Sequence, residues 1–234
     1  MISSKTAHRV SLICGGLILV LLGYSLSQPP TVPCGDLPKG YPPIIAFELA
    51  RSVGDLQQLF GQSADACRAA LVKQVDAVNW IDVFPFIPLY TAFLGFFFIG
   101  MRARNRTVAN LGAVLMIVAA LADYAENTAL FHISAGPDSP AWLPWLEIAT
   151  AIKWLLLGVG GALGANLLSK RGGFDYALAA LCLISLLAPI AAIADPHAYG
   201  PFVSNGITVS WLVFLFVDIR ESVRRSSPAQ SLGD

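Results

Sequence analysis

Long stretches without a charged residue recur along the chain, and they limit how it can fold more than any other feature. A transmembrane helix needs about 20 consecutive apolar residues, with a range of about 17–25. Six stretches approach this length, two of them interrupted by two charged residues each: 10–26, 83–101, 107–131, 145–169, 176–194 and 196–217. Only 13% of all residues are charged, against about 25% in a typical soluble domain. The sequence therefore predicts an all-α, polytopic membrane bundle with six transmembrane spans.

The positions of Lys and Arg predict the orientation, because short cytoplasmic loops are enriched in both. Most of the 15 basic residues fall at one set of helix ends: Lys5, Arg9, Arg102, Arg104, Arg106, Lys170, Arg171, Arg220, Arg224 and Arg225. The opposite loops, 132–144 and 195–202, contain none. We expect a multi-pass protein of the cell (inner) membrane with both termini in the cytoplasm, residues 220–234 being a cytoplasmic tail.

Residues 1–27 allow two interpretations. Lys5 and Arg9 before a short apolar stretch are typical of a signal peptide as well as of a transmembrane anchor. Residues 25–27, Ser-Leu-Ser, match the small-x-small cleavage pattern poorly, and Tyr24 before them is bulky. We therefore expect a retained first transmembrane anchor, with a cleaved signal peptide as the alternative.

Residues 28–78 form the only sizeable segment outside the predicted spans, and we expect them to cover a five-span bundle at 79–219 as an external cap. The segment begins with "QPPTVPCGDLPKGYPP", which is too rich in Pro and Gly for regular structure. Apolar spacing then predicts one amphipathic helix over 44–61 and a second short helix over 63–78, with Ser63 as its N-cap.

Cys34 and Cys67 are the only cysteines in this cap, which we place in an oxidising compartment. We predict a disulfide between them, which would stabilise the fold by about 3–4 kcal/mol in the chain-entropy model. Two free thiols are the alternative. Cys14 and Cys182 lie within predicted spans and are expected to be packing residues.

Polar residues inside the spans gather toward the external side of the membrane. Asp123, Glu126 and Asn127 are spaced i, i+3, i+4, so one face of a helix presents all three. Lys153 lies about 15 Å into the fourth span, near mid-membrane. Because neighbouring spans run antiparallel, further polar residues fall in the same external half of the membrane. The polar residues that we expect there are Asp82, Asp123, Glu126, Asn127, Glu147 and Lys153. We expect no comparable group in the cytoplasmic half.

A charge inside a membrane costs several kcal/mol unless it is paired, so Lys153 is expected to pair with Asp123 or Glu126. One interpretation is that this triad has a purely structural role and holds the helices together through polar contacts. The carboxylates outnumber the ammonium, however, and a surplus acid must hold a proton or await a cation, which favours a functional site. In an enzyme, Asp123 or Glu126 would be the general acid or base, Lys153 would stabilise a developing anion, and Asn127 would orient the substrate.

Other motifs add less. Residues 160–164 place Gly160 and Gly164 four apart, which predicts close helix packing inside the bundle or between two copies in a homo-oligomer.

Pro85 and Pro88 are expected to break or kink the outer turns of the second span. The three histidines show no metal-ligand spacing, so we predict neither metal nor cofactor. The net charge of zero gives no support for nucleic-acid binding.

Four motifs together resemble a pattern found in small bacterial multi-pass membrane proteins. They are "FELARS" at 47–52, "D..PF...Y" from Asp82 to Tyr90, "D..EN" from Asp123 to Asn127, and Lys153. The likeness covers residues 44 to about 168. It implies that the "FELARS" helix and three spans form one unit with Glu48 facing the polar cluster, and it implies no activity. One mid-membrane lysine does not indicate a retinal protein, and the absence of Cys-x-x-Cys excludes disulfide-forming membrane oxidoreductases.

The function we expect first is binding, with or without modification, of a membrane lipid or other apolar small molecule that carries a polar head. Asp123, Glu126 and Lys153 are the candidate catalytic residues. The candidate substrate-binding residues are Glu48, Asp82, Tyr90, Asn127 and Glu147. The alternatives are a proton- or cation-coupled transporter and a structural or assembly subunit of a membrane complex.

The orientation is testable with reporter fusions. Fusions after Arg104, Lys170 and Ser227 should report a cytoplasmic location, and fusions near Asp138 and His197 an external one, because the basic loops stay inside. Paired phosphatase and fluorescent-protein reporters at each position provide the measurement and its control. A single reversed position would refute the six-span topology.

Overall fold

The computed structural model describes residues 2–170 and 172–224, and every regular element in these ranges is a helix. Six helical segments are long and apolar enough to cross a membrane, which confirms the predicted all-α fold with six membrane-length spans. They are α1 (Ser4–Ser27), the segment Ala66–Ala103, α6 (Arg106–Ala135), α7 (Leu143–Ser169), α8 (Phe174–Ala194), and the segment Pro196–Val223. The last segment contains α9 (Pro196–Tyr199), η3 (Gly200–Phe202) and α10 (Val203–Arg224). Arg171 and residues 225–234 of the predicted tail lie outside the described residues.

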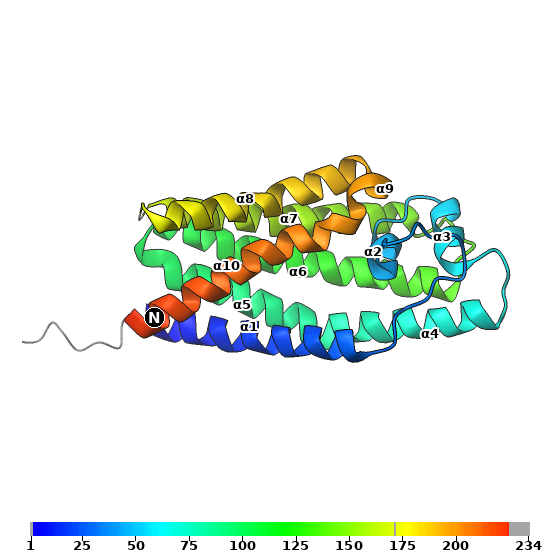
Figure 1. Ribbon diagram of the computed structural model, residues 1–234, viewed down its shortest axis with the longest axis horizontal. Coiled ribbons are helices and arrows are strands. Elements are labelled where there is room, and N and C mark those ends of the chain that lie inside the picture. Colours follow the sequence, from blue (N-terminus) through cyan, green and yellow to red (C-terminus); the bar gives the residue numbers. More distant parts are fainter. Residues whose placement is uncertain (1, 171, 225–234) are drawn as a thin grey trace, which may run out of the picture.

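The long helices run side by side along the longest axis of the molecule (Figure 1). The beginning of α1 and the end of α10 lie together at one end, which we call the terminal end. The other end, the cap end, carries α2 (Pro43–Glu48), α3 (Val53–Phe60) and the first turns of α4 (Ala66–Ile81). Within the bundle, α7 packs between α6 and α8, and α1 packs against α5 (Ile87–Gly100) and α10.

The segment expected to form one amphipathic helix over 44–61 is two helices, α2 and α3, so that prediction was wrong. The first ends at Glu48, and Ser52 starts the second, because its hydroxyl accepts a hydrogen bond from the Asp55 N–H while the Asp55 carboxylate accepts one from the Ser52 N–H. This reciprocal capping box satisfies backbone donors that a continuous helix would have used internally. The interruption leaves Glu48 as the last residue of α2, directed at the bundle.

The predicted second helix of the cap is also different. It begins at Ala66 with Asp65 as its N-cap, not Ser63, because the Asp65 carboxylate accepts a hydrogen bond from the Arg68 N–H. It then continues without interruption into the second span through a π-helical turn, η1 (Asp82–Phe86). The expected break at Pro85 does not occur. The wider π turn tolerates a residue that lacks an N–H and would clash with the preceding turn of an α-helix.

The disulfide between Cys34 and Cys67 is confirmed, with the two Cα atoms 5.9 Å apart. It links the loop before α2 to the first turn of α4. The cap also packs on the bundle, since Phe47, Leu59 and Phe60 share a buried apolar cluster with residues of α6 and α7 such as Leu130 and Leu146. Cys14 and Cys182 are free thiols.

The glycines at 160 and 164 are buried inside the chain. A side chain at Gly160 would collide with Met116 of α6, and one at Gly164 with the Phe214 ring of α10. The small residues therefore allow neighbouring helices of the same chain to approach α7 closely. Association of two copies through this stripe stays a prediction.

Removing the disulfide should destabilise the fold. Cys34→Ser and Cys67→Ser should each lower the free energy of unfolding by about 2–5 kcal/mol, because the unfolded chain regains the conformations that the cross-link removes. The double variant should cost no more than either single one, since both break the same bond. Thermal unfolding with and without a reducing agent measures this. A reducing agent that lowers the stability of the double variant as much as that of the wild type would contradict the prediction.

Candidate functional site

Lys153 of α7 is paired with three carboxylates near the cap end of the bundle. Its Nζ lies 2.5 Å from Glu126 Oε1, 2.9 Å from Glu48 Oε2 and 3.6 Å from Asp123 Oδ1. The four side chains are almost completely buried and come from α2, α6 and α7. The ammonium donates hydrogen bonds to Glu126 and Glu48, and the longer approach to Asp123 is an ion pair.

Hydrogen bonds extend this group toward the second span. The Tyr90 hydroxyl donates to Asp123 Oδ2 at 3.0 Å, and Asn127 Nδ2 donates to Asp82 Oδ2 at 2.7 Å. The same amide nitrogen also lies 3.3 Å from Asp123 Oδ1. We call the connected set the Lys153 cluster; its members are Glu48, Asp82, Tyr90, Asp123, Glu126, Asn127 and Lys153.

Two residues that the sequence analysis missed hold Glu48 in place. The Trp154 indole N–H donates to Glu48 Oε2 at 3.2 Å, and the Thr150 hydroxyl donates to the Glu48 backbone carbonyl at 3.1 Å. Thr150, Lys153 and Trp154 have the same i, i+3, i+4 spacing as Asp123, Glu126 and Asn127 on α6. This spacing places Thr150 and Trp154 on the same helix face as Lys153, so the sequence alone could have predicted both as neighbours of the site.

One of the predicted site residues lies outside the cluster. The carboxylate of Glu147 is 49% exposed and pairs with Arg51 Nε at 3.2 Å. It lies six positions from Lys153, which is about one and two-thirds helical turns, so the two side chains leave α7 on different faces. The other seven predicted site residues lie together in the Lys153 cluster.

A cavity of about 170 Å³ adjoins the Lys153 cluster. Glu48, Asp82, Tyr90, Asp123 and Lys153 contribute to its polar side. The rest of its wall is almost entirely apolar and comes largely from α1 and α10, with Ile18, Leu19, Ile207 and Trp211 among the lining residues. These two helices come together at the terminal end and diverge toward the cap end (Figure 1).

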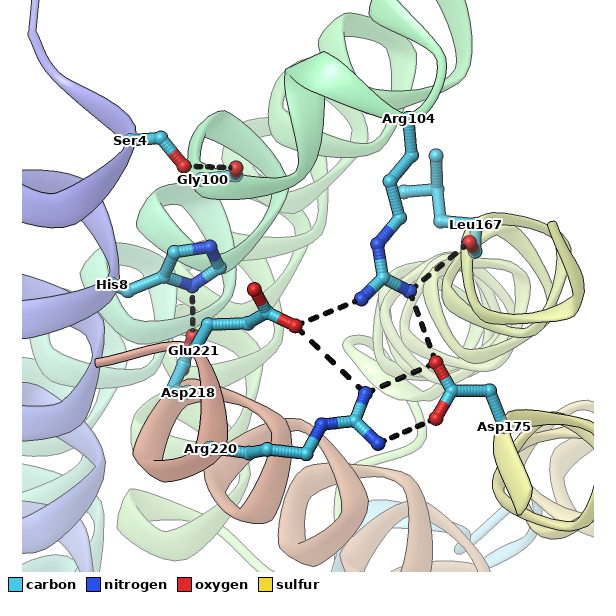
Figure 2. Close-up of polar contacts among 9 residues, drawn as sticks. All are labelled: Ser4, His8, Gly100, Arg104, Leu167, Asp175, Asp218, Arg220 and Glu221. Carbon is cyan, nitrogen blue, oxygen red and sulfur yellow. Dashed lines mark hydrogen bonds and ion pairs between the residues drawn. The ribbon is translucent and has the colours of Figure 1, made fainter. Parts of the chain in front are cut away.

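The terminal end also holds buried charges, and this corrects the expectation that no such group exists there (Figure 2). Arg220 forms two bonds to Asp175, at 2.5 and 3.0 Å, while Arg104 lies 3.2 Å from Glu221 and 3.6 Å from Asp175. From the sequence, Arg104 and Arg220 belonged to exposed loops. The packing of α8 and α10 against the turn after α5 encloses them instead, each beside an acid from another element.

His8 is part of the same end and is buried. Its Nδ1 lies 2.6 Å from Asp218 Oδ1, and the Ser11 hydroxyl donates to Asp218 Oδ2 at 2.5 Å. Asp218 of α10 thus joins two successive turns of α1. The contact fixes α1 to α10 where the two helices meet.

The charges of the Lys153 cluster do not balance. Four carboxyl groups, those of Glu48, Asp82, Asp123 and Glu126, surround the single ammonium of Lys153. Uncompensated buried charges cost several kcal/mol each, so the cluster must hold protons or attract a cation. Glu126 Oε2 is buried without a hydrogen-bond partner among the described residues, which makes this carboxyl group one place for a proton.

No group of three or more His, Cys, Asp or Glu side chains in residues 2–170 and 172–224 is placed to hold a metal ion. Fold and site together define a helical protein with six membrane-length helical segments and a charged, partly enclosed site at one end. No protein-family model, curated protein or solved structure matches the chain. Its function can therefore be inferred only from the site.

Replacing Lys153 tests its role as the cation of the cluster. Lys153→Met should lower the free energy of unfolding by about 3–5 kcal/mol, because it leaves buried carboxylates without a partner. Adding Glu126→Gln should recover part of this loss, since one surplus acid disappears. Denaturation in detergent measures both effects. The control, Lys73→Met on the exposed side of α4, should stay within about 0.5 kcal/mol of the wild type. A Lys153→Met loss no larger than that of the control would exclude this role.

Proposed function

We propose that the protein binds a lipid or another apolar small molecule with a polar head in the cavity beside Lys153. The observation that supports this best is the division of the cavity wall. One side is formed by the charged and hydroxyl groups of the cluster, and the remainder by mostly apolar side chains of α1, α5, α7 and α10, with Ser204 and Thr208 among them. An amphiphile has the same division, with a head that needs polar partners and a tail that needs none.

The route of entry in this proposal is sideways from the membrane. Leu19, Leu22 and Leu212 line the cavity and are also 46%, 40% and 51% exposed on the outside of the bundle. In a bilayer, such side chains contact acyl chains, so a lipid tail can pass between α1 and α10 without crossing water. The head then meets the carboxyl groups at the inner end of the cavity.

We further propose that the cap end faces the non-cytoplasmic side of the cell (inner) membrane. Two independent features support this orientation. The disulfide belongs to the cap, and disulfides persist in oxidising compartments. The loops with most Lys and Arg lie at the terminal end, as the positive-inside rule requires of a cytoplasmic face.

Chemical modification of the ligand is a narrower part of the proposal, and Asp123 is the residue best placed for it. It lines the cavity and accepts a hydrogen bond from Tyr90, so it could pass a proton to or from a bound head as a general acid or base. The arrangement favours Lys153 less as the stabiliser of a developing anion, because three carboxylates already lie around its charge. Binding is therefore the main proposal.

A proton- or cation-coupled transporter is the second candidate. The observation in its favour is that both ends of the bundle contain buried ionisable groups, the Lys153 cluster at one end and Asp218 with His8 at the other. The buried aromatic rings of Phe93, Phe97 and Phe214 lie between these groups. A relay would have to pass this apolar layer, which is why we place transport second.

Two leucines of α1 give a matched test of binding in the cavity. Leu19 and Leu17 are 46% and 47% exposed, yet only Leu19 lines the cavity. Leu19→Trp should fill the cavity and weaken retention of a bound amphiphile by about tenfold, equivalent to about 1.4 kcal/mol. Leu17→Trp should leave retention unchanged. Native mass spectrometry of the purified protein, with collisional activation that strips loosely attached lipids, measures the retained molecule. Equal retention by both variants would contradict binding at this cavity.

A further inference from the structure

We infer that the head of the bound amphiphile is cationic, an amine or a quaternary ammonium group. The inference rests on the proposed function and adds to it the chemical class of the ligand. It follows from the partners of Lys153, from the carboxylates that face the cavity, and from the aromatic rings beside them.

Lys153 is a poor partner for an anionic head. It lines the cavity, but its ammonium is already hydrogen-bonded to Glu48 and Glu126 and ion-paired with Asp123. A phosphate or carboxylate head that approached it would come close to these carboxylates and add a further negative charge to the four acids of the cluster. The nearby Arg51 gives no substitute, because it pairs with Glu147 and donates to the Ile193 carbonyl.

The carboxylate of Asp82 is the group that a cation would meet. It lines the cavity, and its partner in the described part of the chain is the Asn127 amide, which neutralises no charge. Asp123 lines the same side of the cavity and shares Lys153 with two other acids. A cationic head placed between Asp82 and Asp123 would change the balance from four acids against one cation to four against two.

Aromatic rings complete the surroundings of such a head. Phe86, Tyr90, Phe93 and Trp211 all line the cavity. The Trp211 ring centroid lies 5.6 Å from that of Tyr90, 6.0 Å from that of Phe86 and 6.1 Å from that of Phe93. The faces of aromatic rings attract cations, and groups of such rings bind quaternary ammonium ligands. An anionic head would be repelled by the same faces.

The local backbone places these groups together. Asp82 and Phe86 are the first and last residues of the π turn η1, and Tyr90 follows one turn later in α5. π turns inside helices occur often at functional sites, because they redirect the side chains that follow. The volume of about 170 Å³ is about ten times the roughly 15 Å³ that one water requires, which leaves room for a head of several atoms.

The test compares amphiphiles that differ only in the head. The wild-type protein in nonionic alkyl-maltoside micelles is titrated with compounds that share one brominated alkyl tail and carry trimethylammonium, sulfate or maltoside heads. Bromine quenches tryptophan fluorescence at short range, and Trp154 and Trp211 line the cavity. The saturable part of the quenching, which an unbrominated analogue displaces, gives each affinity. We expect the ammonium compound to bind at least about tenfold more tightly than the sulfate.

Two variants and a control connect the preference to the site. Asp82→Asn keeps the shape of the side chain and should bring the two affinities to within about threefold of one another. Phe86→Leu should weaken binding of the ammonium compound and leave that of the sulfate unchanged. Asp76→Asn, about one and two-thirds turns earlier, on α4 and outside the cavity, should keep the wild-type preference.

The outcomes separate the two proposals. Equal binding of the ammonium and sulfate compounds, or a preference that survives Asp82→Asn, would overturn the cationic head and leave amphiphile binding intact. Tighter binding of the sulfate compound would do the same. If no compound shows saturable, displaceable quenching, the proposed function fails, and the inference about the head fails with it.

Discussion

A buried ammonium group surrounded by carboxylates is the interaction on which the cap end depends. Lys153 lies in a region of low dielectric constant, where an unpaired cation would cost several kcal/mol. Its partners come from α2 and α6, so the need to pair one charge brings a cap helix and two membrane-length helices together. Trp154 and Thr150 bind Glu48 from the same face of α7 and fix the last turn of α2 against the bundle.

The two ends of the bundle use charge in different ways. At the terminal end, the guanidinium groups of Arg104 and Arg220 face the carboxylates of Asp175 and Glu221. This network joins α8, α10 and the turn after α5 (Figure 2). The Lys153 cluster has four acids for one cation, and it alone of the two adjoins the cavity of about 170 Å³. Unbalanced charges beside a cavity favour ligand binding over a purely structural role for the Lys153 cluster.

Part of the candidate site could be predicted from the sequence. The i, i+3, i+4 spacing on α6 placed Asp123, Glu126 and Asn127 on one face, and antiparallel packing was enough to bring Lys153 to the same depth. Glu48 entered only through the resemblance of its motif, because a residue in a short helix of the cap has no periodicity that points at a span. Glu147 lies outside the cluster, since depth along the bundle says nothing about which face of α7 a side chain leaves. The buried charges at the terminal end were missed for the opposite reason, because position near a span end suggested solvation.

By itself, the sequence determined the six membrane-length helices and the pairing of Cys34 with Cys67. Hydrophobic length and the scarcity of charge are local properties, and the cap contains two cysteines, which leaves one partner for each. Only the tertiary structure decided which acids share Lys153, where the chain passes Pro85 without a break, and how α1 and α10 enclose a cavity. These features depend on the relative rotation and divergence of helices far apart in the chain. Such rotations are set by side-chain packing between neighbours, which no local pattern encodes.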